Sequence, residues 1–293
     1  YFYLYMLRKA VELSSGKSMP AYAWGMGTEW YGATGDEAEK MKASIKLALN
    51  NGFDHLDSAQ MYKNELSSGQ AISEWLSEHP DRSRAELFIT SKLADGNKAK
   101  DQVKSSAEQT IKELKVDYLD LFLVHSPFKS DVPIKETWEA MESLVDKELV
   151  RSIGVSNFRV KELKELLSTA RIKPTVNQIE YHPFVVNQEL VDFCNEQNIV
   201  LMSYSGLAPI IHYKGPLDDV LAQLSEKYAT SPSKILQMWL LAQDIGIVTT
   251  TSKEHRMKEF FILPNETLSK EDVEQISSIG KQHPQRKYWA DVW

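Results

Sequence analysis

Phe88-Ile89-Thr90-Ser91-Lys92 is a strand-like run of apolar and β-branched residues that ends with a lysine. Two other such runs also end at polar groups: Asp57-Ser58-Ala59-Gln60-Met61-Tyr62 follows one, and Val124-His125 closes the other. Several strand ends that supply one polar cluster are typical of the carboxyl-terminal face of a barrel of parallel strands. The three runs therefore predict one proton-transfer site made of Asp57, Tyr62, Lys92 and His125.

Outward from these runs, the chain alternates short β-branched or aromatic stretches with longer amphipathic ones. Strands are expected at 21–25, 53–57, 87–91, 118–124, 150–155, 175–180, 200–204 and 245–249. Helices are expected at 36–50, 65–78, 101–114, 134–149, 160–169, 187–198, 216–228 and 270–280. Strand–helix alternation implies parallel pairing with right-handed crossovers, so eight units predict an α/β fold, a (β/α)8 TIM barrel.

No Gly/Ser-rich linker or shift in composition divides the chain, so residues 11–293 are expected to form a single domain. Residues 11–20 resemble a β-hairpin with Ser15-Gly16 at its turn, placed to close the barrel floor. Residues 1–10 are an N-terminal extension to which we assign no role. Arg8 and Lys9 follow its apolar residues instead of preceding them, which is the wrong charge order for a secretory signal.

The composition narrows the classes of partner. The chain has 293 residues, of which 42% are hydrophobic and 26% charged, as in globular proteins with a full core. Its formal net charge of -7 argues against nucleic acid and anionic membranes, since phosphate binding needs a basic surface. No transmembrane run is expected. This composition is compatible with a small-molecule partner and does not by itself indicate one. The oligomeric state stays open, with a monomer slightly favoured.

The cysteine and the histidines argue against disulfide and metal chemistry. Cys194 is the one cysteine, so an intramolecular disulfide is excluded and a reducing compartment such as the cytoplasm is expected. Its neighbours favour a buried apolar role over a reactive thiol, because no adjacent cation would lower its pKa. The seven histidines show no paired ligand spacing such as H-x-x-x-H, so no metal site is expected and His55 is interpreted as structural.

Longer motifs carry a family resemblance. Gly52-Phe53-Asp54-His55-Leu56-Asp57, continued to Tyr62 and Glu65, resembles the signature around the catalytic Asp and Tyr of the aldo-keto reductases. Leu119 to Pro127 is similar to that family's strand carrying the catalytic His, and 153–158 with 176–178 resembles its nicotinamide-contacting strands. The resemblance runs from about Val11 to the carboxyl terminus. His125 to Phe128 and Val248 to Arg256 are most similar to the fungal branch with conjugated polyketone and α-keto amide reductases.

The chemistry of carbonyl reduction indicates a role for each of the four candidate catalytic side chains. Carbonyl reduction by a hydride leaves an alkoxide that must be protonated, and Tyr62 is the candidate acid. A free phenol has a pKa near ~10, and a neighbouring cation lowers it. Lys92 would be that cation, Asp57 would keep it charged, and His125 would hydrogen-bond the substrate carbonyl. Any one of them alone is more ordinarily a structural group; all four at strand ends favour catalysis.

The resemblance also implies a cofactor, NADPH. Gly25-Met26-Gly27-Thr28 lacks the third Gly of a Rossmann fingerprint, so an extended cofactor across the barrel mouth is expected instead. Ser156, Asn157 and Gln178 are expected at its carboxamide, Tyr204 at its nicotinamide ring, and Gly27 and Thr28 where the backbone approaches it. Ser205 and Leu207 are expected at its diphosphate. Its adenosine half is expected to meet Ser252, Lys253 and Arg256 at a helix start, which favour a 2′-phosphate, and Glu259 at the adenine.

Use of NADH stays open, because the spacing from Ser252 to Arg256 is one residue shorter than in many members of the family. Phe260 also stands where an adenine-binding Asn is frequent.

Aromatic residues are the candidate substrate contacts. Trp30, Phe128 and Trp289 could line an apolar pocket above the catalytic cluster, since barrel loops and chain ends vary to set specificity. Trp24 and the tail residues Tyr288 and Trp293 are weaker candidates. Core packing is the alternative for each.

The expected function is NADPH-dependent reduction of aldehydes or ketones, including α-dicarbonyls and keto amides or esters. A cofactor-sensing regulatory subunit and a catalytically idle barrel are the alternatives. The intact set Asp57, Tyr62, Lys92 and His125 argues against the idle barrel, because such a protein needs no acid with an activating cation.

Overall fold

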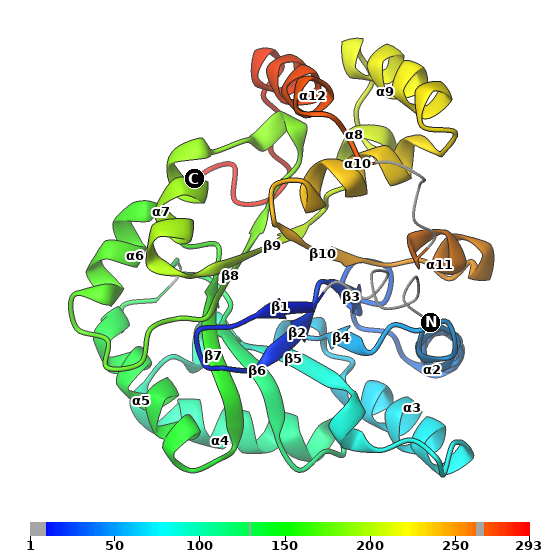
Figure 1. Ribbon diagram of the computed structural model, residues 1–293. Helices are drawn as coiled ribbons and strands as arrows, with labels where there is room; N and C mark the ends of the chain where they lie inside the picture. Colours follow the sequence, from blue (N-terminus) through cyan, green and yellow to red (C-terminus); the bar gives the residue numbers. More distant parts are fainter. Residues whose placement is uncertain (1–9, 129, 262–266) are drawn as a thin grey trace.

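A closed barrel of eight parallel strands forms the centre of the molecule (Figure 1). The computed structural model describes residues 10–128, 130–261 and 267–293. The barrel strands are β3 (Tyr22–Gly25), β4 (His55–Asp57), β5 (Phe88–Leu93), β6 (Leu119–Val124), β7 (Val150–Ser156), β8 (Val176–Glu180), β9 (Val200–Tyr204) and β10 (Gly246–Thr249). They pair in chain order, and β10 closes the ring on β3. The predicted (β/α)8 fold is confirmed, with strand ends within two residues of expectation.

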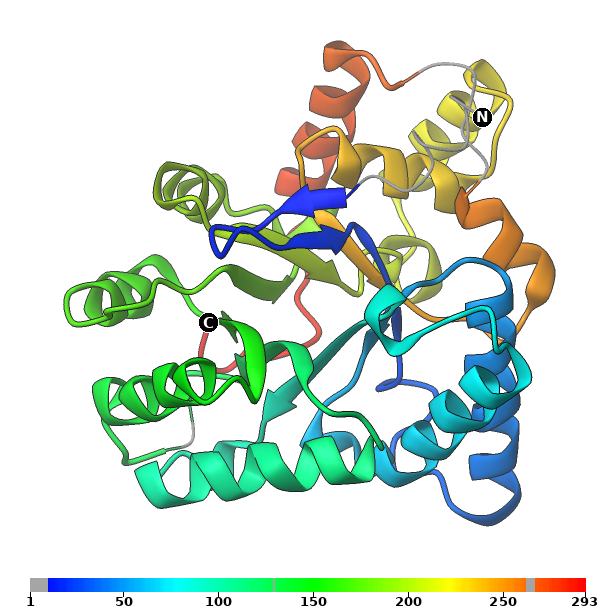
Figure 2. The ribbon, with the colours of Figure 1, turned by 60° about the horizontal axis from the view of Figure 1, so that its bottom comes forward.

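Helices surround this barrel (Figure 2). The eight expected helices are α2 (Gly35–Asn50), α3 (Glu65–Glu78), α4 (Lys100–Glu113), α5 (Ile134–Asp146), α6 (Val160–Leu167), α7 (Gln188–Gln197), α9 (Pro216–Lys227) and α12 (Lys270–Gln282). Helix α11 (Glu254–Phe261) begins where a helix start was expected. The sequence did not predict α8 (Ala208–Ile211) or α10 (Pro232–Leu241). In α10 every residue from Lys234 to Leu240 is buried, so it lacks the one-sided apolar stripe that reveals a helix.

The β-hairpin closes one end of the barrel. Strand β1 (Ala10–Glu12) pairs antiparallel with β2 (Ser18–Pro20), and Gly16 at the turn has a φ of 74°, which glycine adopts without strain. Leu13 and Met19 are buried with residues from inside the barrel, namely Ala23, Phe88, Leu121, Leu123, Val176 and Met202. Figure 1 shows the hairpin lying across the ring of strands. The predicted barrel floor is thus confirmed; residues 1–9 of the predicted extension lie outside the described residues.

A larger apolar core lies between the strands and the helices, and it includes Cys194 and Trp24. Cys194 on α7 is fully buried in this core, and burial raises its pKa to about 12. Trp24 on β3 is also fully buried, and its Nε1 donates to the Thr251 carbonyl at 3.4 Å. It is a core residue and does not contact a substrate cavity. His55 bridges the Pro20 carbonyl and Thr90 Oγ1 at 3.0 and 2.9 Å, the structural role that was expected.

Within the described ranges, no helix is long and apolar enough to cross a membrane. The same ranges contain no group of three His, Cys, Asp or Glu side chains placed to hold a metal ion.

Candidate active site

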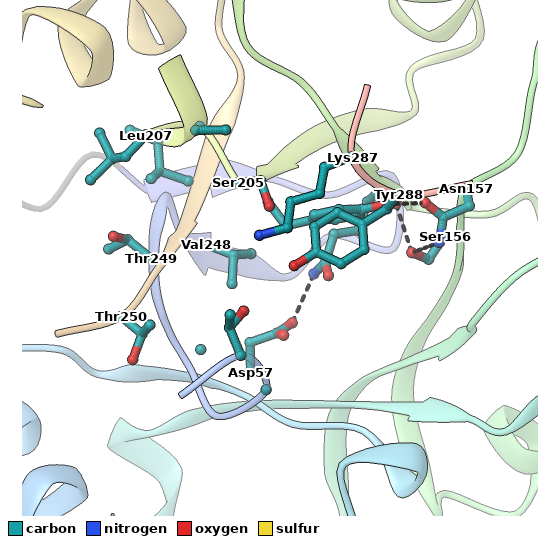
Figure 3. Close-up of a pocket in the computed structure, with 18 of the residues that line it drawn as sticks. Asp57, Ser156, Asn157, Ser205, Leu207, Val248, Thr249, Thr250, Lys287 and Tyr288 are labelled. Carbon is teal, nitrogen blue, oxygen red and sulfur yellow. Dashed lines mark hydrogen bonds between the residues drawn. The ribbon is translucent and has the colours of Figure 1, made fainter. Parts of the chain in front are cut away.

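A cavity of about 710 Å³ opens at the carboxyl-terminal ends of the strands, opposite the hairpin (Figure 3). Most of the predicted site residues line it: Gly27, Thr28, Asp57, Tyr62, His125, Ser156, Asn157, Gln178, Tyr204, Ser205, Leu207 and Trp289. They come from the ends of different strands and the loops that follow, as the polar run endings indicated. The carboxyl-terminal segment forms one wall of the cavity through Lys287, Tyr288, Trp289 and Asp291, of which the sequence suggested Tyr288 and Trp289. Trp293 is not in the lining and packs against the core.

Tyr62, Lys92 and Asp57 form a cluster on the cavity floor, in which Tyr62 is half-buried and the two charged residues are buried. The Lys92 ammonium donates to Asp57 Oδ1 at 2.5 Å and to the Ser58 carbonyl at 2.9 Å. It also lies 3.3 Å from the Tyr62 hydroxyl. Both charged side chains are almost completely shielded from solvent, with 1% and 2% of their side-chain area exposed. A buried ion pair of this kind is stable only when its remaining groups are hydrogen-bonded, and Gln178 Nε2 donates to the second Asp57 oxygen at 2.7 Å.

The protonation states in this cluster differ from expectation in one respect. Burial opposes a charge on Lys92, but Asp57 and Tyr62 outweigh it and raise the lysine pKa, so the ammonium is retained. From the sequence, Lys92 was expected to lower the Tyr62 pKa below that of a free phenol. In the structure burial is the larger influence and raises the Tyr62 pKa, with Lys92 acting in the opposite direction. The phenol therefore keeps its proton at neutral pH and has one to donate.

His125 stands beside this phenol as a neutral imidazole. Its ring lies 5.9 Å from the Tyr62 ring, centroid to centroid, at an interplanar angle of 83°. Burial, reinforced by the charges of Lys92 and Lys98, lowers the His125 pKa to about 3. Its Nδ1 is buried without a hydrogen-bond partner among the described residues. A neutral imidazole at this place can donate one N–H to a ligand without bringing a second positive charge beside Lys92.

The loop that holds Tyr62 is fixed from both sides. Tyr62 ends a short 3₁₀ turn (η1, Gln60–Tyr62), and its carbonyl accepts from Gly32 N at 2.8 Å. On the other side, a Cβ at Gly27 would lie 2.8 Å from the Tyr62 ring. The sequence attributed Gly27 to close approach by the cofactor; in the structure its missing side chain makes room for the phenol ring.

A second polar network lies at the ends of β7, β8 and β9. Asn157 has a φ of 63°, and its Nδ2 donates to the His125 carbonyl at 2.9 Å. Tyr204 OH donates to Asn157 Oδ1 at 2.7 Å, and Ser156 Oγ donates to the Gln178 carbonyl at 2.7 Å. These hydrogen bonds bring together the four residues that the resemblance places around a nicotinamide, of which Ser156 and Asn157 are labelled in Figure 3.

The residues expected at the adenosine half lie away from this cavity, at the start of α11. Lys253 and Arg256 are exposed, and the carbonyl of Lys253 accepts from Arg256 N at 3.0 Å in the first turn. Ser252 Oγ donates to Glu29 at 3.2 Å. Glu259 is half-buried and accepts a hydrogen bond from Ser231. Ser252, Lys253 and Arg256 lie at the start of α11 and Glu259 lies in its second half. All four stay predicted contacts.

The predicted substrate residues have different positions. Trp289 lines the cavity, and the Phe128 ring packs on it with centroids 5.4 Å apart. Phe128 is therefore one layer behind the cavity wall. Trp30 is only 8% exposed and lies in the core, outside the cavity lining. The apolar rim consists instead of Tyr31, Met61 and Ile211, which are 57%, 38% and 64% exposed and which the sequence argument did not identify.

Behind Lys92, a buried carboxyl group takes no part in the cavity. Glu65, the first residue of α3, accepts from Ser91 Oγ at 2.6 Å and from Thr110 Oγ1 at 3.1 Å. Burial raises its pKa from 4.5 to about 7, against the opposing influence of these two hydroxyl groups. Since Ser91 precedes Lys92 on β5, this carboxyl group supports the strand that carries the lysine.

Replacing Glu65 with Gln is expected to change how the free energy of unfolding depends on pH. The pKa of the Glu65 carboxyl group is higher in the folded state than in the unfolded state, so protonation of Glu65 stabilises the fold. This contribution to the free energy of unfolding is complete below about pH 4.5 and is lost as the pH rises through about 7. A glutamine side chain does not titrate, so the variant keeps its stability over this pH range. Between low and high pH, its free energy of unfolding should therefore rise relative to that of the wild type by about 3 kcal/mol. Urea unfolding at several pH values measures it. Glu108→Gln, an exposed change on α4, is the control; equal pH dependence in all three proteins would contradict the expectation.

A parallel barrel with a phenol facing a cavity and a buried ammonium and carboxylate beside it, all at the carboxyl-terminal strand ends, has the layout of a TIM-barrel enzyme. Comparison with known proteins makes this class more specific. Residues 23–281 match the model of the Aldo/keto reductase family. The chain belongs to this family, as its motifs predicted.

Several characterised relatives match over nearly their whole length. The chain is 38% identical to the NAD/NADP-dependent indole-3-acetaldehyde reductase of Schizosaccharomyces pombe, covering 93% of this chain and 96% of that protein. It is 36% identical to the glyoxal reductase of Bacillus subtilis, covering 94% of each. It is 34% identical to the NADPH-dependent alpha-keto amide reductase of Saccharomyces cerevisiae, covering 96% and 94%. The fungal relatives agree with the branch indicated by the sequence.

Solved structures give the same result. The crystal structure of a Bombyx mori aldo-keto reductase in complex with NADP superposes with a TM-score of 0.85 at 29% identity, covering 92% of each chain. The aldose reductase of Schistosoma japonicum gives a TM-score of 0.86 at 28% identity, covering 96% of this chain and 94% of that one.

Proposed function

We propose that this protein reduces aldehydes or ketones to alcohols with NADPH, and that Tyr62 is the general acid. One observation carries the proposal: the Tyr62 hydroxyl faces a cavity while lying 3.3 Å from an ammonium group that Asp57 holds at 2.5 Å. This arrangement places a protonated phenol beside the one charge that stabilises its conjugate base. The names of the relatives, all reductases or dehydrogenases, support the same reaction class.

NADPH, when bound, supplies the hydride that the carbonyl carbon accepts. The residues at the cavity fit its nicotinamide: Ser156, Asn157 and Gln178 present hydroxyl and amide groups, and Tyr204 presents a ring for stacking. Gln178 already donates to Asp57, so its Oε1 would accept from a carboxamide. The 2′-phosphate would bind Ser252, Lys253 and Arg256 at the start of α11, with Glu259 near the adenine. Relatives named for NADP, and one named for NAD and NADP, support NADPH with NADH as a second cofactor.

The residues of the chain would then act on the substrate oxygen. His125 orients the carbonyl through one N–H, and Tyr62 donates its proton to the oxygen as negative charge develops there. Lys92 stabilises the resulting tyrosinate, and Asp57 keeps Lys92 charged. The proton is regained from solvent through the open cavity.

The substrate class follows from the rim. Tyr31, Met61, Ile211 and Trp289 form an apolar border, which favours carbonyl compounds that carry an apolar substituent over free sugars. Relatives named for indole-3-acetaldehyde and an alpha-keto amide support such substrates.

The decisive assay follows NADPH and NADH absorbance with a panel of carbonyl compounds. We expect turnover of indole-3-acetaldehyde, α-diketones and keto amides, weaker turnover of sugars, and a lower KM for NADPH than for NADH. NADPH binding without turnover of any member would contradict the proposal and favour a cofactor-sensing regulatory role. Neither binding nor turnover would favour the catalytically idle barrel.

A further inference from the structure

The carboxyl-terminal segment over the cavity is held by a buried carboxylate. Glu180, the last residue of β8, is fully buried, and its two oxygens accept from Lys287 N at 3.0 Å and Tyr288 N at 2.8 Å. His182 Nε2 lies 3.2 Å from the same carboxylate. Because a barrel strand fixes Glu180, the main chain at residue 287 is held in one place at the cavity mouth.

The side chain that leaves this anchored point reaches across the mouth. Lys287 Nζ lies 2.8 Å from His212 Nε2, which follows α8 on the other side, and both residues line the cavity. Burial and the charge of Lys287 lower the His212 pKa, so the imidazole is neutral and can accept a hydrogen bond from the ammonium. Figure 3 shows the amino group of Lys287 drawn toward Ser205.

The charge at this position is unusual for the cavity. Among the described lining residues, Lys287 is the one lysine or arginine, since the other cation of the site, Lys92, lies behind the lining and is paired with Asp57. No carboxylate of the described ranges forms an ion pair with Lys287. An unpaired ammonium group, aimed over a cavity in a chain of net charge -7, has the chemistry of an anion-binding group.

We propose that Lys287, aimed by Glu180 and His212, binds the bridging diphosphate of the dinucleotide across the mouth of the cavity. The inference rests on the proposed function, because it assumes a dinucleotide in this cavity. Ser205 and Leu207, on the opposite side of the mouth, were expected at the same diphosphate, and Ser205 has a φ of 57° that belongs to a tight turn. Lys287 adds the positive charge that this loop lacks.

The test measures NADP⁺ dissociation constants of Lys287→Met, Lys287→Arg and the wild type, by quenching of tryptophan fluorescence. A charge-assisted contact at an exposed position should be worth about a tenfold loss of affinity in Lys287→Met, partly recovered in Lys287→Arg. The NADP⁺ affinity of Lys287→Met should also depend less on salt concentration than that of the wild type, because one ionic contact is gone. Lys214→Met is the matched control: Lys214 is exposed, lies two residues from His212, pairs with Asp218 and does not line the cavity. Its affinity should equal that of the wild type.

Two further ligands locate the contact on the dinucleotide. Adenosine 2′-phosphate has no bridging diphosphate, so Lys287→Met and the wild type should bind it equally. An affinity loss for this ligand would overturn the assignment. Phenylglyoxylate carries a carboxylate where phenylglyoxal carries an aldehyde. If Lys287→Met raises only the KM for phenylglyoxylate, Lys287 binds the substrate carboxylate, and its assignment to the diphosphate is overturned.

The outcomes separate this inference from the proposed function. If the wild-type protein fails to bind NADP⁺, the proposed function is wrong. If the wild type binds and turns over NADPH while Lys287→Met binds it equally well, only the role of Lys287 is wrong.

Discussion

Replacing Tyr62 with Phe is expected to lower kcat by about a thousandfold while leaving the dissociation constant for NADPH nearly unchanged. The ring would keep its place against Gly27 and His125, so the cavity keeps its shape. Only the hydroxyl group 3.3 Å from Lys92 is removed, and with it the proton that the alkoxide requires. Single-turnover kinetics with NADPH and a good aldehyde substrate, together with cofactor titration, measure both quantities.

Tyr118→Phe provides the matched control for this variant. Tyr118 lies just before β6, where Arg84 and Arg151 pack on its ring, at the end of the barrel away from the cavity. The same loss of a hydroxyl group there should leave kcat unchanged. Ordinary turnover by Tyr62→Phe would remove the phenol from the proposed chemistry and leave water as the proton donor.

Replacing Lys92 with Met is expected to lower kcat by a similar factor and, in addition, to destabilise the fold. Tyrosinate would lose its stabilising cation, and Asp57 would be left as a buried carboxylate facing only Gln178. Removing one partner of a buried ion pair costs about 3–5 kcal/mol, because the remaining charge stays uncompensated. Thermal unfolding and steady-state turnover of the same preparation measure the two effects.

A double variant separates stability from catalysis. Lys92→Met with Asp57→Asn removes both charges and keeps an amide that can accept from Gln178, so most of the lost stability should return. Turnover should stay as low as in the single variant. Recovery of both stability and turnover would contradict the role of Lys92 in activating Tyr62.

Sequence patterns were sufficient for the barrel and for the residues on its strand ends. Asp57, Lys92 and His125 each follow a short apolar run, and parallel pairing brings such ends to one face whatever their separation along the chain. Tyr204 and Asn157 were predicted in the same way, from motifs at the ends of their strands. The local sequence pattern is sufficient to predict these site residues, because the position of each one depends only on the strand that carries it.

Other parts of the site depend on contacts that no local pattern records. Lys287 reaches the cavity because Glu180, 107 residues earlier, holds its main chain. Trp30 resembled a cavity residue in sequence but lies in the core, since Asn64 fixes its loop by donating to the Trp30 carbonyl at 2.8 Å. The pKa of Tyr62 is raised and not lowered because loss of solvent around the phenol outweighs the neighbouring cation, and the amount of solvent around a side chain cannot be read from its own strand.

The buried position of Cys194 has a consequence for resistance to oxidation. Its pKa of about 12 leaves a negligible fraction as thiolate at neutral pH, and the thiolate is the form that peroxides attack. It is also the one sulfhydryl in the chain. Hydrogen peroxide at concentrations that inactivate enzymes with exposed thiolates should therefore leave this protein's thiol intact, so loss of activity in peroxide would have to come from other side chains.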